Sequence, residues 1–138
     1  MQDPQINLLM VLIAALLNNI IGALWYSPLL FGEAWRRALG KTKEDFQVMQ
    51  KDSMRAMGLN AIAILFLTYV FAHFILAVNA ETALGGATAG FWVWIGFVAT
   101  TGFANVVFEN RSKKVYLIYQ AYQCVALVVT GALLAVWQ

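Results

Sequence analysis

The sequence is poor in charge. Of its 138 residues only 12% are Asp, Glu, Lys or Arg, whereas 62% are hydrophobic and the mean hydropathy is +0.70. A soluble domain carries about a quarter of its residues as charged groups, so this chain has too few to cover a surface in water. The composition predicts an integral membrane protein, with residues 1–138 as one polytopic domain and no separate soluble domain.

The charged residues are clustered, and four long segments carry none. Each segment is long enough for a membrane-spanning helix of about 20 residues. Helices are expected because backbone polar groups in hydrocarbon must pair within their own segment. The sequence therefore predicts an all-α fold, a bundle of four transmembrane helices. The expected spans are Ile6–Leu24, Leu59–Val78, Gly86–Val107 and Val115–Val136.

All nine basic residues fall between the first and second spans or between the third and fourth. Lys and Arg in short loops are retained on the cytoplasmic side, so both loops are expected there and both termini outside. The net charge of +2 is then a topological signal and predicts no nucleic-acid partner. Because residues 1–5 contain Asp3 and no basic residue, the first span is expected to be retained rather than cleaved as a secretory signal.

The loop at 25–58 is the longest segment outside the predicted spans. Apolar residues over 29–39 alternate with Glu33, Arg36 and Arg37 at spacings that suit a short amphipathic helix on the inner membrane surface. Gly40 is expected to end this helix. Thr42, with Asp45 three residues later, forms a weak capping box, and the helix that it opens is expected to run into the second span.

Two segments carry a resemblance to a known family. They are Leu24-Trp25-Tyr26-Ser27-Pro28-Leu29-Leu30-Phe31-Gly32-Glu33-Ala34-Trp35 and Asn105-Val106-Val107-Phe108-Glu109-Asn110-Arg111-Ser112, the latter leading into Tyr116-Leu117-Ile118. On these segments the chain resembles the bacterial membrane family called domain of unknown function 1761 (DUF1761). The resemblance implies a small four-helix protein of the bacterial inner membrane, and no activity, substrate or cofactor.

Uncharged polar residues inside the spans are the remaining indication of function. Three spans place such residues at one depth, in the half nearer the cytoplasm; the candidates for a polar belt or cavity are Asn18, Asn19, Thr101, Asn105, Gln120 and Gln123. The loop residues expected below them, as a cytoplasmic mouth, are Tyr26, Ser27, Glu109 and Arg111. Such amides and hydroxyls either join helices to one another or line a cavity open to the cytoplasm.

Known catalytic and metal signatures are missing from the sequence. It contains no GxSxG, HExxH, Walker or GxGxxG motif, so we expect neither enzyme activity nor a cofactor or bound metal. Cys124 is the only cysteine, which excludes an intramolecular disulfide. His73 is the only histidine, and a hydrogen-bonded packing role is favoured over a haem or metal ligand.

Two hypotheses follow. The protein is a structural or accessory subunit of a membrane complex, or a small homo-oligomer, with the polar belt as internal glue. Alternatively, it is a small oligomeric channel or carrier for a neutral or weakly charged solute. Ionisable groups are missing at depth apart from His73, which argues against a proton pump. Small residues at Gly86, Gly90, Gly131 and Ala135 predict close helix contact, within one chain or between subunits.

Overall fold

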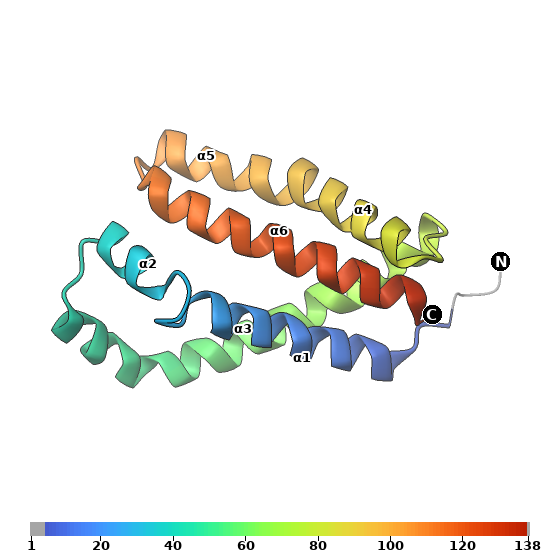
Figure 1. The fold of residues 1–138 in the computed structure, drawn as a ribbon, viewed down its shortest axis with the longest axis horizontal. Helices are drawn as coiled ribbons and strands as arrows, with labels where there is room; N and C mark the ends of the chain where they lie inside the picture. Colours follow the sequence, from blue (N-terminus) through green and yellow to red (C-terminus); the bar gives the residue numbers. More distant parts are fainter. Residues whose placement is uncertain (1–4, 138) are drawn as a thin grey trace.

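The computed structural model describes residues 5–137, with residues 50 and 51 described by their backbone alone. The described chain is helical and forms a bundle (Figure 1). The elements are α1 (Leu8–Trp25), α2 (Gly32–Ala38), α3 (Lys43–Ala77), α4 (Ala83–Val93), the π-helical turn η1 (Trp94–Ala99), α5 (Thr100–Phe108) and α6 (Lys113–Val136). Residues 1–4, which include the Asp3 used to predict that the first span is retained, lie outside the described residues.

Four helical segments are long and apolar enough to cross a membrane. They cover Leu8–Trp25, Asp52–Ala77, Ala83–Phe108 and Lys113–Val136. These are the four expected spans, with ends displaced by a few residues, so the all-helical, four-helix prediction is confirmed. At 1.5 Å per residue, a segment of 26 residues is about 39 Å long, which exceeds a hydrocarbon core of about 30 Å.

Each spanning helix begins at a residue whose side chain caps it. Asn7, Thr42, Thr82 and Ser112 each accept a hydrogen bond from a backbone N–H in the first turn. At Thr42 the expected capping box is present, because Asp45 also accepts from the Thr42 N–H at 3.2 Å. This satisfies donors that a helix start otherwise leaves unpaired. The helix that it opens continues without a break through the second span, as predicted.

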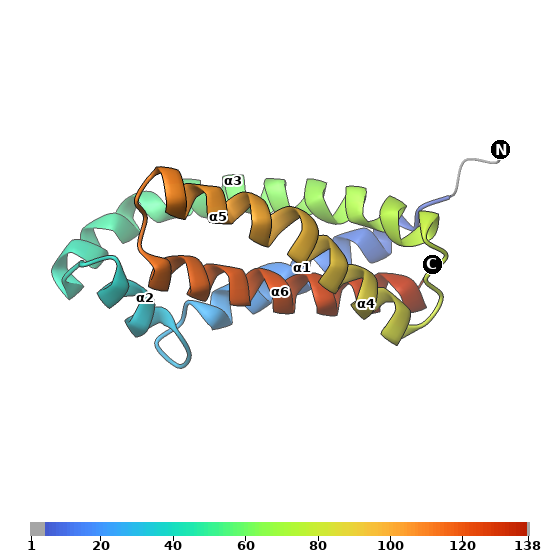
Figure 2. The same cartoon turned by 90° about the horizontal axis from the view of Figure 1, so that it is seen from above.

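The segment between α1 and α3 folds into the short helix α2. It ends where the sequence predicts, because Gly40 has a φ of +69°, a conformation that suits glycine after a helix. Figures 1 and 2 show α2 oblique to the long axis of the bundle, at the end opposite the two termini. Its position on a membrane surface stays a prediction.

The helix α6 lies at the centre of the bundle and contacts α1, α3 and α4. The buried core includes Val11, Ala14, Phe71, Ala72, Ile75, Leu127 and Leu134. These residues come from the first half of α1, the last part of α3 and the second half of α6, and these segments meet at the end where the termini lie (Figure 2). There α4 approaches α6 closely enough that a Cβ on Gly86 would lie 2.0 Å from the Gly131 carbonyl oxygen. The small residues of the third and fourth spans therefore pack against each other within one chain.

The other end of the bundle is more open. Helix α5 has no buried residue, and most side chains of α3 before Ile64 are exposed. Both turns that carry basic residues, α1–α3 and α5–α6, lie at this end (Figure 1). The chain thus has a tightly packed half near the termini and a loosely packed half near its basic loops.

Candidate functional site

A buried polar contact joins α1 to α6. The Tyr122 hydroxyl donates to Asn18 Oδ1 at 2.8 Å, and both side chains are buried. Gly22 makes room for the tyrosine, because a Cβ there would lie 3.2 Å from the Tyr122 hydroxyl. Asn19 instead donates to the Ala15 carbonyl of its own helix at 2.9 Å. Of the two predicted asparagines, only Asn18 connects helices.

Gln120 makes a separate contact on another face of α6. Its Oε1 accepts from the Trp94 indole at 3.2 Å, and the residue is buried. Gly102 lies directly against this amide, since a Cβ there would lie 2.6 Å from Gln120 Nε2. Gln120 and Tyr122 are about 200° apart around the helix, because each residue advances the turn by about 100°. The two buried amides therefore bond to different helices.

A π-helical turn interrupts the third span at residues 94–99. Side-chain hydroxyls cover its carbonyls: Thr100 donates to Gly96 O at 2.7 Å, and Thr101 donates to Phe97 O. Tyr116 of α6 donates to Ala99 O at 2.7 Å. These bonds supply partners to carbonyl groups that water cannot reach in a bilayer. The Thr101 hydroxyl thus bonds to the backbone of its own helix rather than lining a cavity.

The two remaining candidates for the polar belt, Asn105 and Gln123, make no hydrogen bond to another helix within the described part of the chain. Asn105 is exposed and makes no side-chain hydrogen bond within the described part of the chain. Gln123 donates to the Tyr119 hydroxyl at 2.7 Å, one turn earlier on α6. The hydrogen bonds of the six predicted residues therefore do not bring them together in one space between the helices.

The residues of the predicted mouth lie on two separate turns. Glu109 and Arg111 form an exposed ion pair of 2.6 Å. Ser27 donates to the Leu24 carbonyl at 2.7 Å and so closes the end of α1. The Tyr26 ring lies 5.8 Å from the Tyr122 ring and 5.1 Å from that of Trp35. Burial, with the nearby tyrosines of α6, raises the pKa of the Tyr26 hydroxyl.

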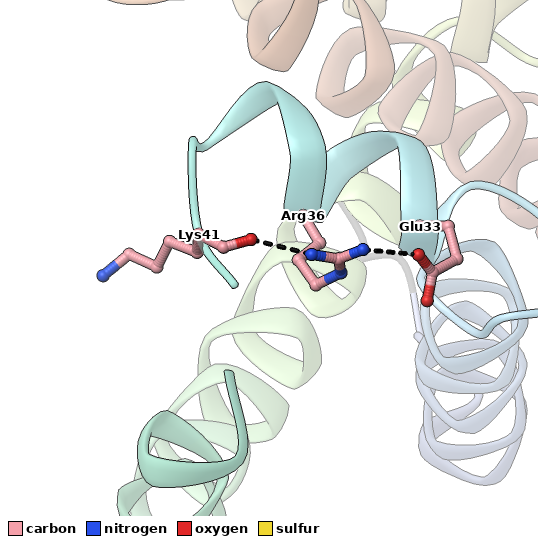
Figure 3. Close-up of polar contacts among 3 residues, drawn as sticks. All are labelled: Glu33, Arg36 and Lys41. Atoms are coloured by element: carbon pink, nitrogen blue, oxygen red, sulfur yellow. Dashed lines mark hydrogen bonds and ion pairs between the residues drawn. The ribbon is translucent and has the colours of Figure 1, made fainter. Parts of the chain in front are cut away.

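An arginine holds α2 and the turn after it in place (Figure 3). Arg36 donates from Nη2 to Glu33 at 2.7 Å and from Nη1 to the Lys41 carbonyl at 2.8 Å. This bond from Arg36, with the positive charges nearby, holds the pKa of the Glu33 carboxyl below its usual range. Through its ion pair with Glu33 and its hydrogen bond to Lys41, Arg36 therefore links the first turn of α2 to the loop that enters α3.

His73 is hydrogen-bonded but does not lie in the core. Its Nδ1 is 3.0 Å from the Tyr69 carbonyl oxygen, and its ring meets the Tyr69 ring edge to face, with centroids 4.7 Å apart. The side chain is exposed on α3. The expected hydrogen bond is thus present, whereas packing involves only the neighbouring turn of the same helix.

The hydrogen bonds that indole N–H groups make between helices were not predicted from the sequence. Trp25 donates to the Ile118 carbonyl at 3.1 Å and Trp94 donates to Gln120, so both join helices to α6. A signal was available, because a tryptophan N–H that is buried in a bundle needs an acceptor.

Comparison with known proteins gives a family and no function. Nothing among the curated proteins or the solved structures matches this chain. One family model, described as a protein of unknown function, matches residues 9–135. This range includes both segments that carry the resemblance, and it covers the four apolar helices except for one residue at each end, Leu8 and Val136. The chain therefore belongs to the DUF1761 family.

Proposed function

We propose that this protein is a non-enzymatic structural or accessory subunit of a membrane complex, or a small homo-oligomer, in the bacterial cytoplasmic membrane. Both termini face outward in this proposal, and the two basic loops face the cytoplasm. The proposal is supported by the position of both basic loops at one end of the bundle (Figure 1), since positive loops are retained inside.

One observation supports a structural role for the polar belt, in which its side chains hold the helices together. The two buried amides of the spans are each hydrogen-bonded to another helix. Asn18 accepts from Tyr122, and Gln120 accepts from Trp94. An interhelical hydrogen bond of this kind contributes about 0.6 kcal/mol, and at most about 2 kcal/mol. Such groups stabilise the bundle without requiring a solute.

The alternative of a channel or carrier for a neutral solute needs a path past these residues. The belt amides face different helices, and Asn105 faces away from the bundle. A path would therefore have to form between several copies. No observation in the chain favours it over the packing role.

The test separates stability from transport. Asn18→Leu and Gln120→Leu are expected to lower the free energy of unfolding by about 1 kcal/mol each in detergent micelles. Liposomes with the wild-type protein are expected to show the same glycerol permeability as empty liposomes, measured by light scattering after an osmotic step. Permeability above that of empty liposomes, abolished by either variant without loss of stability, would contradict the proposal.

Asn105→Leu is the matched control, because it makes the same change at an exposed position of a span. It is expected to leave the unfolding of the single chain unchanged. Light scattering of the purified protein gives its oligomeric mass. A mass that falls on this substitution would place Asn105 between subunits and favour the homo-oligomer over the accessory subunit.

A further inference from the structure

The basic end of the bundle carries an excess of positive charge. Residues 26–58 and 109–114 together hold nine basic and five acidic residues, which gives a formal charge of +4. The turn between α3 and α4, at the other end, carries Glu81 and no basic residue. The two ends therefore differ in sign as well as in packing.

Most of the acidic groups at this end are engaged locally. Glu33 pairs with Arg36, Glu109 pairs with Arg111, and Asp45 caps α3. Among the described residues, six exposed basic side chains form no ion pair: Arg37, Lys41, Lys43, Arg55, Lys113 and Lys114. Their charge is left for a partner outside the chain.

An apolar corner comes just before α2, the helix that carries Arg37. Leu29 and Leu30 are 85% and 55% exposed, between the end of α1 and the start of α2. The corner is rigid, because Phe31 N–H donates to Trp25 O at 2.9 Å and Gly32 N–H donates to Ser27 O at 3.0 Å. Gly32 has no room for a side chain, since a Cβ would lie 2.4 Å from the Tyr26 carbonyl oxygen. The two leucines are thus held outward.

Apolar side chains at the acyl boundary combined with unpaired cations at headgroup level are the features that bind an anionic bilayer surface. Trp25 supports this depth, because tryptophan favours the interface. We propose that this face, formed by Leu29, Leu30 and the basic residues nearest the two turns, Arg37, Lys41, Lys43, Lys113 and Lys114, binds the headgroups of anionic phospholipids in one leaflet. This goes beyond the packing role and holds whichever leaflet the face meets.

The experiment measures which lipids surround the protein. The chain is reconstituted in phosphatidylcholine liposomes with trace spin-labelled phosphatidylglycerol or phosphatidylcholine, and the bound fraction of each label is compared. The wild type is expected to prefer phosphatidylglycerol by about fivefold for each cation that a headgroup contacts. Because salt screens exposed charges, 1 M NaCl should bring the ratio close to one.

Two double variants locate the surface. Arg37→Gln with Lys41→Gln, and Lys113→Gln with Lys114→Gln, should each lower the ratio severalfold. Lys113→Arg with Lys114→Arg, which keeps the charge, should not. Equal binding of the two lipids by the wild type, or a ratio that neither salt nor these variants change, would overturn the proposal. So would a ratio abolished by millimolar inorganic phosphate at constant ionic strength, because that result indicates a simple anion site.

Discussion

Replacing Gly90 by alanine should force the third and fourth spans apart. A Cβ at this position would lie 2.3 Å from the Leu127 carbonyl oxygen and 2.7 Å from its carbonyl carbon. Ordinary van der Waals contact begins near 3.4 Å, so the helices would have to separate by about 1 Å. The neighbouring atoms belong to a helix backbone and cannot rotate away.

Two opposing effects determine how much Gly90→Ala changes the free energy of unfolding. Overpacking costs about 1–3 kcal/mol, whereas alanine gains up to about 1 kcal/mol over glycine in helix propensity. Because the clash is with backbone atoms, the upper part of the overpacking cost applies, about 2–3 kcal/mol. After the gain in helix propensity is subtracted, the free energy of unfolding should fall by about 1–2 kcal/mol. Titration of the micellar protein with sodium dodecyl sulfate, followed by circular dichroism, measures this difference.

Gly58→Ala is the matched control for Gly90→Ala. This glycine also lies in an apolar helix, but a Cβ there would meet no heavy atom within 4 Å. The control should leave stability unchanged or raise it. Equal stability of wild type and Gly90→Ala, or an equal loss in both variants, would refute the close packing of α4 on α6.

Two further predictions concern the basic end. Hydrogen bonds from Thr42 lower the pKa of the Asp45 carboxyl, so the cap is complete above the ordinary pKa and is lost as pH falls through the lowered value. Amide exchange in the first turn of α3, corrected for intrinsic rates, should accelerate at acid pH and be fast throughout in Asp45→Asn; pH-independent exchange in the wild type would contradict this. Asn110 lies in an exposed turn within an Asn-Arg-Ser acceptor site. It should stay unmodified when the chain is inserted into microsomes, because the proposed orientation keeps this turn on the cytosolic side. A glycosylated product would reverse the proposed orientation.

Local features of the fold were predictable from the sequence. The charge-free segments located the spans, Thr42 and Asp45 predicted the start of α3, and Gly40 predicted the end of α2. These signals depend on composition, capping and backbone conformation within a few residues. Such short-range preferences do not require knowledge of the neighbouring helices.

The partners of the polar residues were less predictable. Gln120 and Gln123 are three residues apart, a spacing that places two side chains on one face of a helix. Their side chains nevertheless bond to different elements. Which helix meets each face of α6 depends on crossing angles and on the order of helices around it, and periodicity contains neither. The π-helical turn was also missed, because it changes the register of the third span by an insertion that leaves its hydropathy intact.

A double-mutant cycle on Asn18 and Tyr122 tests the central claim most directly. Asn18→Ala and Tyr122→Phe each remove one partner of the 2.8 Å bond, and the phenylalanine keeps the ring against Gly22. If buried polar groups stabilise the bundle, the two changes should be coupled by about 0.6 kcal/mol, and at most about 2 kcal/mol, in the free energy of unfolding. Additive effects, with no coupling, would contradict the account.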